Sequence, residues 1–324
     1  MTHAIRMYRT GDPEVLKWEA IEVPAPGANE VRIRHTAVGL NYIDVYYRTG
    51  LYAAPLPFSP GLEAAGVVDA VGGEVTTLKI GDRVAYSSGP LGAYAEARVI
   101  AAERVVKIPD GISDTQAAAM MLQGMTAEYL VRRTYAIKRG DTVLIHAAAG
   151  GVGLILCQWA KHLGATVIGT VGSDAKAVLA SNNGCDYPIV YTREDFQARV
   201  MEITHGAKVP VVYDSVGRDT FAKSLDCLAP FGLMALFGQA SGPVPPFDLG
   251  QLAAKGSLFI TRPTLFTYTA KRADLEASSR ALFEVVLSGA VKISVNQTYS
   301  LRDAATAHRD LEARRTTGST VFMV

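Results

Sequence analysis

The sequence predicts an α/β protein with two domains, one rich in β-strands and one built on a doubly wound parallel sheet. The chain has 324 residues, and single domains usually have ~100–200. Near residue 123 the pattern changes from short β-rich runs to apolar strands that alternate with helices. A glycine-rich turn lies between a strand and a helix in this second part, as nucleotide-binding sheets require.

Composition excludes several classes of protein. Hydrophobic residues make up 49% of the chain and charged residues 19%, which provides material for a large core and excludes a disordered chain. The net charge of +1 offers no electrostatic footprint for nucleic acid or an anionic membrane. Cys157, Cys185 and Cys227 are widely spaced and the N-terminus has no apolar signal region, so we expect a reduced protein of the cytoplasm.

The first part predicts strands and two helices. We expect strands over residues 31–37, 65–71, 83–86 and 95–99, separated by Gly, Pro and Asp clusters. One helix is expected to begin near Asn41 and to include residues 44–47. A second is expected over residues 115–121, with Asp114 as its N-cap.

The second part predicts a parallel sheet covered by helices on both faces, because its strands are apolar throughout. The expected strands cover residues 142–146, 165–171, 188–191, 209–214, 233–237 and 257–261. The expected helices cover 151–163 and a segment capped by Ser173 or Asp174 that ends near Asn183. In the tail we expect helices over 271–288 and 301–312 and strands over 291–295 and 318–324.

The glycine turn predicts a dinucleotide site. Ala147, Gly150 and Gly153 form the pattern A-x-x-G-x-x-G directly after the strand that ends at residue 146. Small residues permit a tight turn, a close approach of the backbone to a pyrophosphate, and tight packing of helix on strand. The helix N-terminus then supplies N–H groups and a positive dipole for the anion. Although residues 142–160 contain no charged side chain, this cluster favours strand, turn and helix over a membrane span.

The end of the next strand favours NADPH over NADH. NAD sites place an Asp or Glu there, about 20 residues beyond the glycines, to hold the ribose 2′-hydroxyl. Here the strand is followed by Gly172 and Ser173, and Ser173 and Lys176 can hold a 2′-phosphate. We interpret Asp174 as a helix cap that points at the backbone; if it faced the ribose, NADH would be preferred.

These residues resemble the medium-chain dehydrogenase/reductase family, and within it the NADPH-dependent quinone oxidoreductase, or zeta-crystallin-like, branch. The resemblance covers the whole chain. The matching motifs are G-x-P-E-V-L at residues 11–16, N-x-x-D at 41–44, G-L-Y at 50–52, G-L-E-A-A-G-V-V at 61–68, G-D-R-V at 81–84, H-A-A-A-G-G-V-G at 146–153 and V-Y-D-S-V-G at 212–217.

The zinc-dependent branch of this family offers a contrast. Asn41 stands where that branch has its first cysteine ligand, and Leu62 stands where it has a histidine. Neither side chain can replace a thiolate or imidazole ligand of zinc. The four-cysteine lobe of that branch is also missing, since residues 83–92 contain no cysteine. We therefore expect no metal.

The resemblance implies the site residues. At the nicotinamide end it implies Asn41, Tyr46, Thr126 and Tyr129, and we take Asn41, Asp44, Tyr46, Tyr52 and Thr126 as the candidates nearest the reaction. Tyr46 and Tyr52 could bind a quinone, or they could simply pack. The other expected cofactor contacts are Ala147, Gly150, Gly151, Val152 and Gly153 at the turn, then Gly172, Ser173, Lys176, Tyr191, Ser215, Phe237, Gly238, Gln239, Ser241 and Arg314. Arg314 could equally be a solvated charge at a helix end.

The implied fold is a GroES-like catalytic domain over residues 1–122, a Rossmann NADPH-binding domain over 123–264, and a C-terminal segment, 265–324, that returns to the first domain. The implied activity is metal-free reduction of a quinone by NADPH in a cytoplasmic homodimer joined through an edge of the Rossmann sheet. The rivals are a reductase of α,β-unsaturated carbonyls and a non-enzymatic, crystallin-like protein that binds NADPH or RNA. The physiological acceptor, the proton donor and the choice between one-electron and two-electron reduction stay open.

Overall fold

The computed structural model describes residues 2–324 and divides into two compact units. The β-rich unit comprises residues up to 125 together with 268–287 and 293–324, and the parallel-sheet unit comprises 126–267 and 288–292. The two units correspond to the mixed α/β fold class that the sequence predicts, which is confirmed.

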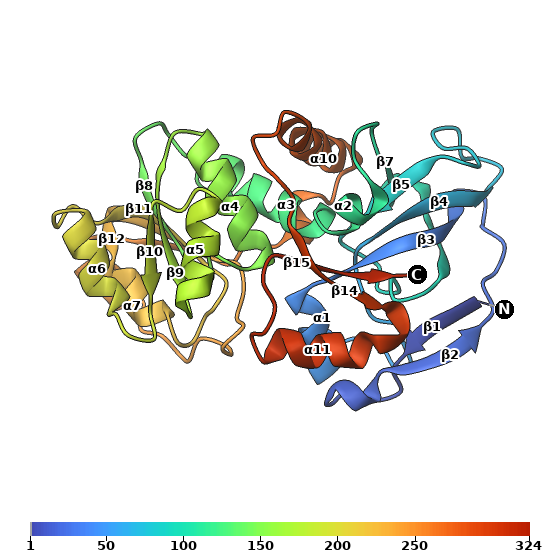
Figure 1. Cartoon of the computed structure of the whole chain (residues 1–324), viewed down its shortest axis with the longest axis horizontal. Helices are drawn as coiled ribbons and strands as arrows, with labels where there is room; N and C mark the ends of the chain where they lie inside the picture. Colours follow the sequence, from blue (N-terminus) through green and yellow to red (C-terminus); the bar gives the residue numbers. More distant parts are fainter. Residues whose placement is uncertain (1) are drawn as a thin grey trace. The chain divides into compact units, whose positions relative to one another are not determined.

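The β-rich unit contains a seven-stranded sheet assembled from both ends of the chain. The path runs β14-β15-β3-β4-β5-β7, and β6 pairs with β3. The strands are β3 (Glu30–Leu40), β4 (Ala64–Val71), β5 (Arg83–Tyr86), β6 (Ala97–Ala101), β7 (Val106–Lys107), β14 (Val295–Ser300) and β15 (Ser319–Met323), and a separate ribbon joins β1 (Thr2–Arg6) to β2 (Lys17–Ile21). C-terminal β15 lies antiparallel to β3, with Phe322 opposite Val38 (Figure 1). The last residues therefore complete a sheet that begins at residue 30.

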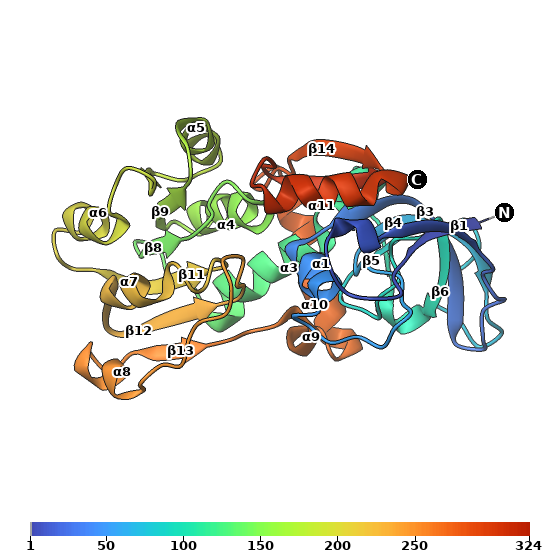
Figure 2. The same ribbon diagram turned by 90° about the horizontal axis from the view of Figure 1, so that it is seen from below.

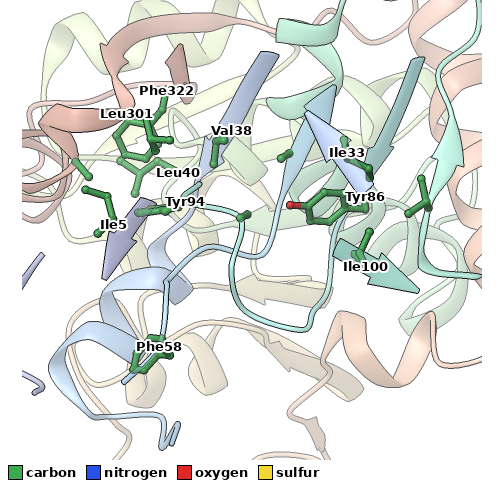
Figure 3. Close-up of a cluster of buried hydrophobic side chains, with 14 of the residues drawn as sticks. Ile5, Ile33, Val38, Leu40, Phe58, Tyr86, Tyr94, Ile100, Leu301 and Phe322 are labelled. Carbon is green, nitrogen blue, oxygen red and sulfur yellow. The ribbon is translucent and has the colours of Figure 1, made fainter. Parts of the chain in front are cut away.

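A cluster of buried apolar side chains lies against this sheet. Figure 3 shows its large side chains converging from β1, β3, β5, β6 and β15, with Ile33, Val38 and Phe322 among those that are fully buried. The rings of Tyr94 and Phe322 pack edge to face at 4.9 Å between centroids. This cluster also positions α1 (Tyr42–Thr49) and α11 (Ala304–Glu312), because Ala307 of α11 belongs to it and Tyr47 of α1 packs against it.

The parallel-sheet unit contains six parallel strands in the order β10-β9-β8-β11-β12-β13. They are β8 (Thr142–Ile145), β9 (Thr166–Val171), β10 (Tyr187–Val190), β11 (Val209–Asp214), β12 (Leu228–Leu236) and β13 (Phe259–Thr261), and they alternate with α4 (Gly151–His162), α5 (Asp174–Asn182), α6 (Phe196–Ile203), α7 (Phe221–Asp226) and α8 (Gly250–Ala254). Figure 2 shows β13 at the outer edge, beside α8. The strand order reverses at β8 and β11, and ligands of such sheets bind outside the carboxyl ends of the strands at that point.

The remaining helices belong to the β-rich unit or straddle its boundary. They are α2 (Asp114–Ala118), α3 (Met121–Tyr129), α9 (Leu265–Tyr268) and α10 (Arg272–Leu287), and a π-helical turn follows α3 at Leu130–Thr134. Among residues 2–324, no helix is long and apolar enough to cross a membrane.

Several sequence predictions about elements were wrong. The helix expected over residues 115–121 is interrupted, because α2 ends at Ala118 and α3 begins at Met121, and β12 begins at Leu228, five residues before the expected start. Ser113, not Asp114, caps α2, and it does so by accepting a hydrogen bond from the Gln116 N–H, whereas Asp114 accepts hydrogen bonds from Arg83 and Thr36. The strand expected over residues 291–295 begins only at Val295, and β6 begins two residues later than expected. Short apolar runs do not mark their own strand ends, because the partner strand decides where pairing begins.

Candidate active site and cofactor site

The glycine turn has the backbone that a close ligand requires. Ala147 has a positive φ of 53°, and Gly150 is the N-cap of α4. A Cβ on Gly153 would lie 2.2 Å from the carbonyl oxygen of Ala147, so only glycine fits there. The first intrahelical hydrogen bond is donated by the Leu154 N–H to the Gly150 carbonyl. The N–H groups of Gly151, Val152 and Gly153 therefore precede the hydrogen-bonded turns, where an anion can accept from them.

The loop after β9 leads into α5, which is capped by one of the two residues that the sequence offered for this position. Ser173 is the N-cap of α5, and its hydroxyl accepts from the Lys176 N–H at 3.4 Å. Asp174 is the first helical residue, and its carboxylate pairs with Arg193 at 2.5 Å. The interpretation of Asp174 as a cap is therefore wrong, because its side chain turns toward the neighbouring loop.

The loops after β11 and β12 pack closely on each other. Asp214 ends β11, and its Oδ1 accepts from the N–H groups of Val216 and Gly217 at 2.6 and 3.1 Å. A Cβ on Gly238 would meet the carbonyl oxygen of Ser215 at 2.5 Å. The Ser241 hydroxyl donates to the Val216 carbonyl at 2.8 Å. Ser215, Phe237, Gly238, Gln239 and Ser241 thus lie together at the carboxyl edge, as predicted for residues that follow these strands.

Asn41 lies at the centre of a chain of buried hydrogen bonds in the β-rich unit. Its Nδ2 donates to Glu63 Oε2 at 2.6 Å, and its Oδ1 accepts from Gln123 Nε2 at 3.1 Å. Gln123 Oε1 in turn accepts from the Ser319 hydroxyl at 2.7 Å. Both hydrogen-bonding ends of the Asn41 amide are therefore engaged, and the side chain is held in one orientation.

Glu63 is a fully buried carboxyl group next to Asn41. Its Oε1 accepts from the backbone N–H of Leu122 at 2.7 Å. Burial raises the pKa of Glu63 to about 8, although the hydrogen bonds from Asn41 and Leu122 favour its charged form. This carboxyl therefore holds its proton more readily than an exposed glutamate, and it hydrogen-bonds to Asn41, a predicted site residue.

Asp44 is a second buried carboxyl group. Its Oδ2 accepts from the Asn41 N–H and from the Tyr94 hydroxyl, both at 2.9 Å. The Tyr94 hydroxyl also lies 3.1 Å from Nε2 of His308. Burial raises the pKa of Asp44 to about 7 and lowers the pKa of His308 to about 3. This arrangement ties α1 and α11 to the Tyr94 loop.

Replacing Asp44 with Asn is expected to flatten the dependence of stability on pH. Because burial raises the pKa of Asp44 from 3.8 to about 7, the folded chain keeps a proton between these pH values that the unfolded chain loses. The contribution of the Asp44 proton to the free energy of unfolding is fully present below pH 4. It is lost as pH rises through 7, by at most about 1.4 kcal/mol per pH unit. The free energy of unfolding, measured with urea, should fall less between pH 5 and pH 7.5 in Asp44→Asn than in the unchanged chain. An equal fall in both proteins would contradict this assignment.

The predicted aromatic residues form a cluster on α1 and the loop after it. The rings of Tyr46 and Tyr52 lie 5.1 Å apart, and the Tyr52 N–H donates to the Tyr46 carbonyl at 3.0 Å. Tyr46 is buried and Tyr52 is half-buried. The two rings are tilted by 59° and pack against each other.

The predicted residues fall in both units. Asn41, Asp44, Tyr46, Tyr52 and Arg314 belong to the β-rich unit, and Arg314 is exposed with a positive φ of 59°. All the other predicted residues belong to the parallel-sheet unit, and Thr126 and Tyr129 lie buried on α3. In the β-rich unit, the structure brings Asn41 and Asp44 together. In the parallel-sheet unit, it brings the glycine turn together with the neighbouring strand ends.

Sequence reasoning missed four side chains that contact these residues. Gln123, Tyr94 and Arg193 carried no local signal, because their partners lie 82, 50 and 19 residues away in the sequence. Glu63 was visible as part of a motif, and a buried carboxyl in that motif could have been assigned to the site. Within residues 2–324, no group of three His, Cys, Asp or Glu side chains could hold a metal ion.

Comparison with known proteins shows the family to which the chain belongs. Residues 27–110 match the family described as "Alcohol dehydrogenase GroES-like domain", and residues 151–276 match the family described as "Zinc-binding dehydrogenase". A quinone oxidoreductase of Pseudomonas aeruginosa is 54% identical over the whole of both chains. The chain belongs to the quinone oxidoreductase family. The resemblance inferred from the motifs is therefore confirmed, together with the GroES-like and Rossmann-type domains of the family.

Other members of this quinone oxidoreductase family are similar along their full length. The crystal structure of the Escherichia coli quinone oxidoreductase complexed with NADPH superposes with a TM-score of 0.98, at 48% identity over all of both chains. A relative from a Burkholderia species, named 2-haloacrylate reductase, is 46% identical over 100% of this chain and 99% of its own. The family thus includes proteins named for two kinds of acceptor.

Proposed function

We propose that this chain is an NADPH-dependent quinone reductase that works without a metal. The observation that carries the proposal is the glycine turn, where Gly153 leaves no room for a Cβ and α4 presents its first N–H groups. The 54% identical quinone oxidoreductase and the NADPH complex of the Escherichia coli relative support both the reaction and the cofactor.

The residues of the parallel-sheet unit fit a dinucleotide phosphate. Gly150, Gly151 and Val152 would hold the pyrophosphate at the N-terminus of α4, over the turn made by Ala147 and Gly153. Ser173 and Lys176 would hold the 2′-phosphate, and Gly172 and Tyr191 would border the adenosine. Ser215, Phe237, Gly238, Gln239 and Ser241 would line the nicotinamide half, where the carboxyl edge continues past β11 and β12. Arg314 would add a charge from the C-terminal segment.

When bound, NADPH supplies a hydride at the nicotinamide ring, and the protein holds the ring and the acceptor in the orientation that the transfer needs. We assign Asn41, Tyr46, Thr126 and Tyr129 to the nicotinamide end. Asn41 is suited to orient a ligand because Glu63 and Gln123 hold its amide on both sides. Tyr46 and Tyr52 offer a hydroxyl or a ring face to a flat acceptor. Asp44 would brace Asn41, because its carboxylate accepts a hydrogen bond from the Asn41 backbone N–H.

The second candidate function is reduction of an activated carbon–carbon double bond. The relative named 2-haloacrylate reductase supports it, because that protein shares 46% of its sequence with this chain. Both reactions need the same placement of NADPH and differ in the acceptor alone. A non-enzymatic role in binding RNA is disfavoured by the net charge of +1.

Acceptor preference tests the proposal. Oxidation of NADPH would be followed at 340 nm with 1,4-benzoquinone, 9,10-phenanthrenequinone, a 2-haloacrylate and an enal. We expect fast turnover with the quinones and slow turnover with the two alkenes. Turnover with an alkene alone would assign the chain to the second function, and no turnover with any acceptor would favour a binding protein.

We also propose a cytoplasmic homodimer joined through β13. This strand is one of the two edges of the parallel sheet, and Phe259 on it is 59% exposed. Pairing of two β13 edges would cover both the open backbone groups and this ring. Cys157, Cys185 and Cys227 are free and buried, which suits a reducing compartment. Light scattering should give twice the chain mass of 34.5 kDa, and a single chain mass would contradict the dimer.

A further inference from the structure

The ends of β9 and β10 place two loops side by side at the carboxyl edge of the parallel sheet. The strands are parallel neighbours, with Val171 opposite Val190. The chain leaves them as residues 172–174 and 191–193. The loops touch, because a Cβ on Gly172 would lie 3.0 Å from the Tyr191 hydroxyl.

An ion pair joins the two loops at their exposed rim. Arg193 donates from Nη1 to Asp174 Oδ2 at 2.8 Å, and its Nη2 lies 2.5 Å from Oδ1. The side chains of Asp174 and Arg193 are 71% and 58% exposed. Arg193 holds the pKa of Asp174 below its usual value, so the carboxylate is charged at neutral pH. An exposed pair of this kind adds little to folding stability.

The position of Asp174 presents an electrostatic problem for an NADPH site. Asp174 directly follows Ser173, which we assign to the 2′-phosphate under the proposed function. A carboxylate at the end of this strand is the group that NAD-binding sheets use to accept the ribose 2′-hydroxyl. It also repels a phosphate that carries almost two negative charges. Left unpaired, Asp174 would therefore favour NADH.

We propose that Arg193 is a specificity residue for the 2′-phosphorylated cofactor. By pairing both oxygens of Asp174, its guanidinium withholds this carboxylate from a ribose hydroxyl and brings a positive charge to the rim where the 2′-phosphate binds. Arg193 has donors beyond the two that Asp174 engages, and a guanidinium can bridge a carboxylate and a phosphate. The inference rests on the proposed NADPH function and adds the residue that makes an acidic strand end compatible with it.

The test measures ligand binding and does not depend on turnover. Adenosine 2′,5′-bisphosphate carries the 2′-phosphate, and 5′-AMP carries a 2′-hydroxyl in its place. Their dissociation constants would be measured by isothermal titration calorimetry for the full chain, for Arg193→Gln, and for Arg193→Gln combined with Asp174→Asn. Arg199→Gln is the matched control, since Arg199 pairs with Glu194 and Glu202 on the same unit. Thermal melting confirms that each variant is folded.

The unchanged chain should bind the bisphosphate more tightly than 5′-AMP. In Arg193→Gln this preference should fall by about tenfold, through weaker bisphosphate binding, because one charge-assisted contact is lost and Asp174 is released. Adding Asp174→Asn should restore part of the preference, and Arg199→Gln should leave it unchanged. If the ratio of the two dissociation constants in Arg193→Gln stayed within twofold of that in the unchanged chain, the role of Arg193 would be overturned. The same holds if both ligands bound more weakly by the same factor. Equal affinities in the unchanged chain would instead contradict the NADPH site itself, and with it the inference.

Discussion

Gly153→Ala is expected to lower kcat/KM for NADPH by on the order of 100-fold. The added Cβ would lie 2.2 Å from the Ala147 carbonyl oxygen and 2.9 Å from Cα of Ala148. Both contacts are with backbone, so the turn must move and cannot yield by a change of rotamer. A shift of about 1 Å displaces the N–H groups that we assign to the pyrophosphate, and misplacements of that size cost catalysis heavily. The clash should also cost about 1–3 kcal/mol of folding stability.

The control for this variant is Gly73→Ala, because a Cβ on Gly73 would meet nothing within 4 Å. It should leave both kcat/KM and the melting temperature close to their original values. If Gly153→Ala lost stability but bound NADPH with unchanged affinity, the turn would serve the packing of α4 on the sheet and not the cofactor.

Asn41→Ala should have the second largest effect, a fall in kcat of about 10- to 100-fold. The change removes the amide that we place at the nicotinamide and deprives Glu63 and Gln123 of a partner each. Binding of adenosine 2′,5′-bisphosphate should be unchanged, because the residues assigned to that half of the cofactor belong to the parallel-sheet unit. This separation distinguishes a local effect at the nicotinamide end from general loss of folded protein.

Asn296→Ala is a matched control for Asn41→Ala. Asn296 also donates a side-chain hydrogen bond within the β-rich unit, to the Thr317 hydroxyl at 2.9 Å, but the contact is exposed. Its replacement should leave kcat unaffected. If kcat fell equally in both variants, or if Asn41→Ala weakened bisphosphate binding, Asn41 would not have the assigned role.

The sequence predicted those parts of the fold and site that depend on local pattern. The strand, turn and helix around Gly150 are one continuous segment, and their steric demands are visible in the glycine spacing itself. Asn41 and Asp44 were also predictable, because a residue at the start of a helix and one three positions later interact through the backbone.

What the sequence could not predict depends on partners that are distant in the chain. Asp is a residue type favoured at helix caps, which is why the sequence suggested that role for Asp174. Only the folded chain places Arg193, from the loop after β10, next to Asp174. The roles of Gln123 and Ser319 depend on β15 returning to the sheet, which brings residues 196 positions apart into one hydrogen bond. The strand expected over residues 291–295 was wrong for a related reason, since β14 pairs only from Val295, opposite Ser319.

The most direct test of the central claim is the choice between the two nicotinamide cofactors. Oxidation of NADPH and, separately, of NADH would be recorded at 340 nm with 1,4-benzoquinone as the acceptor. We predict rapid oxidation of NADPH and little oxidation of NADH. Ser173 and Lys176 follow the end of β9, where they would hold the 2′-phosphate, and Arg193 forms an ion pair with the Asp174 carboxylate. A preference for NADH would contradict it, and would mean that Asp174 serves the ribose hydroxyl after all.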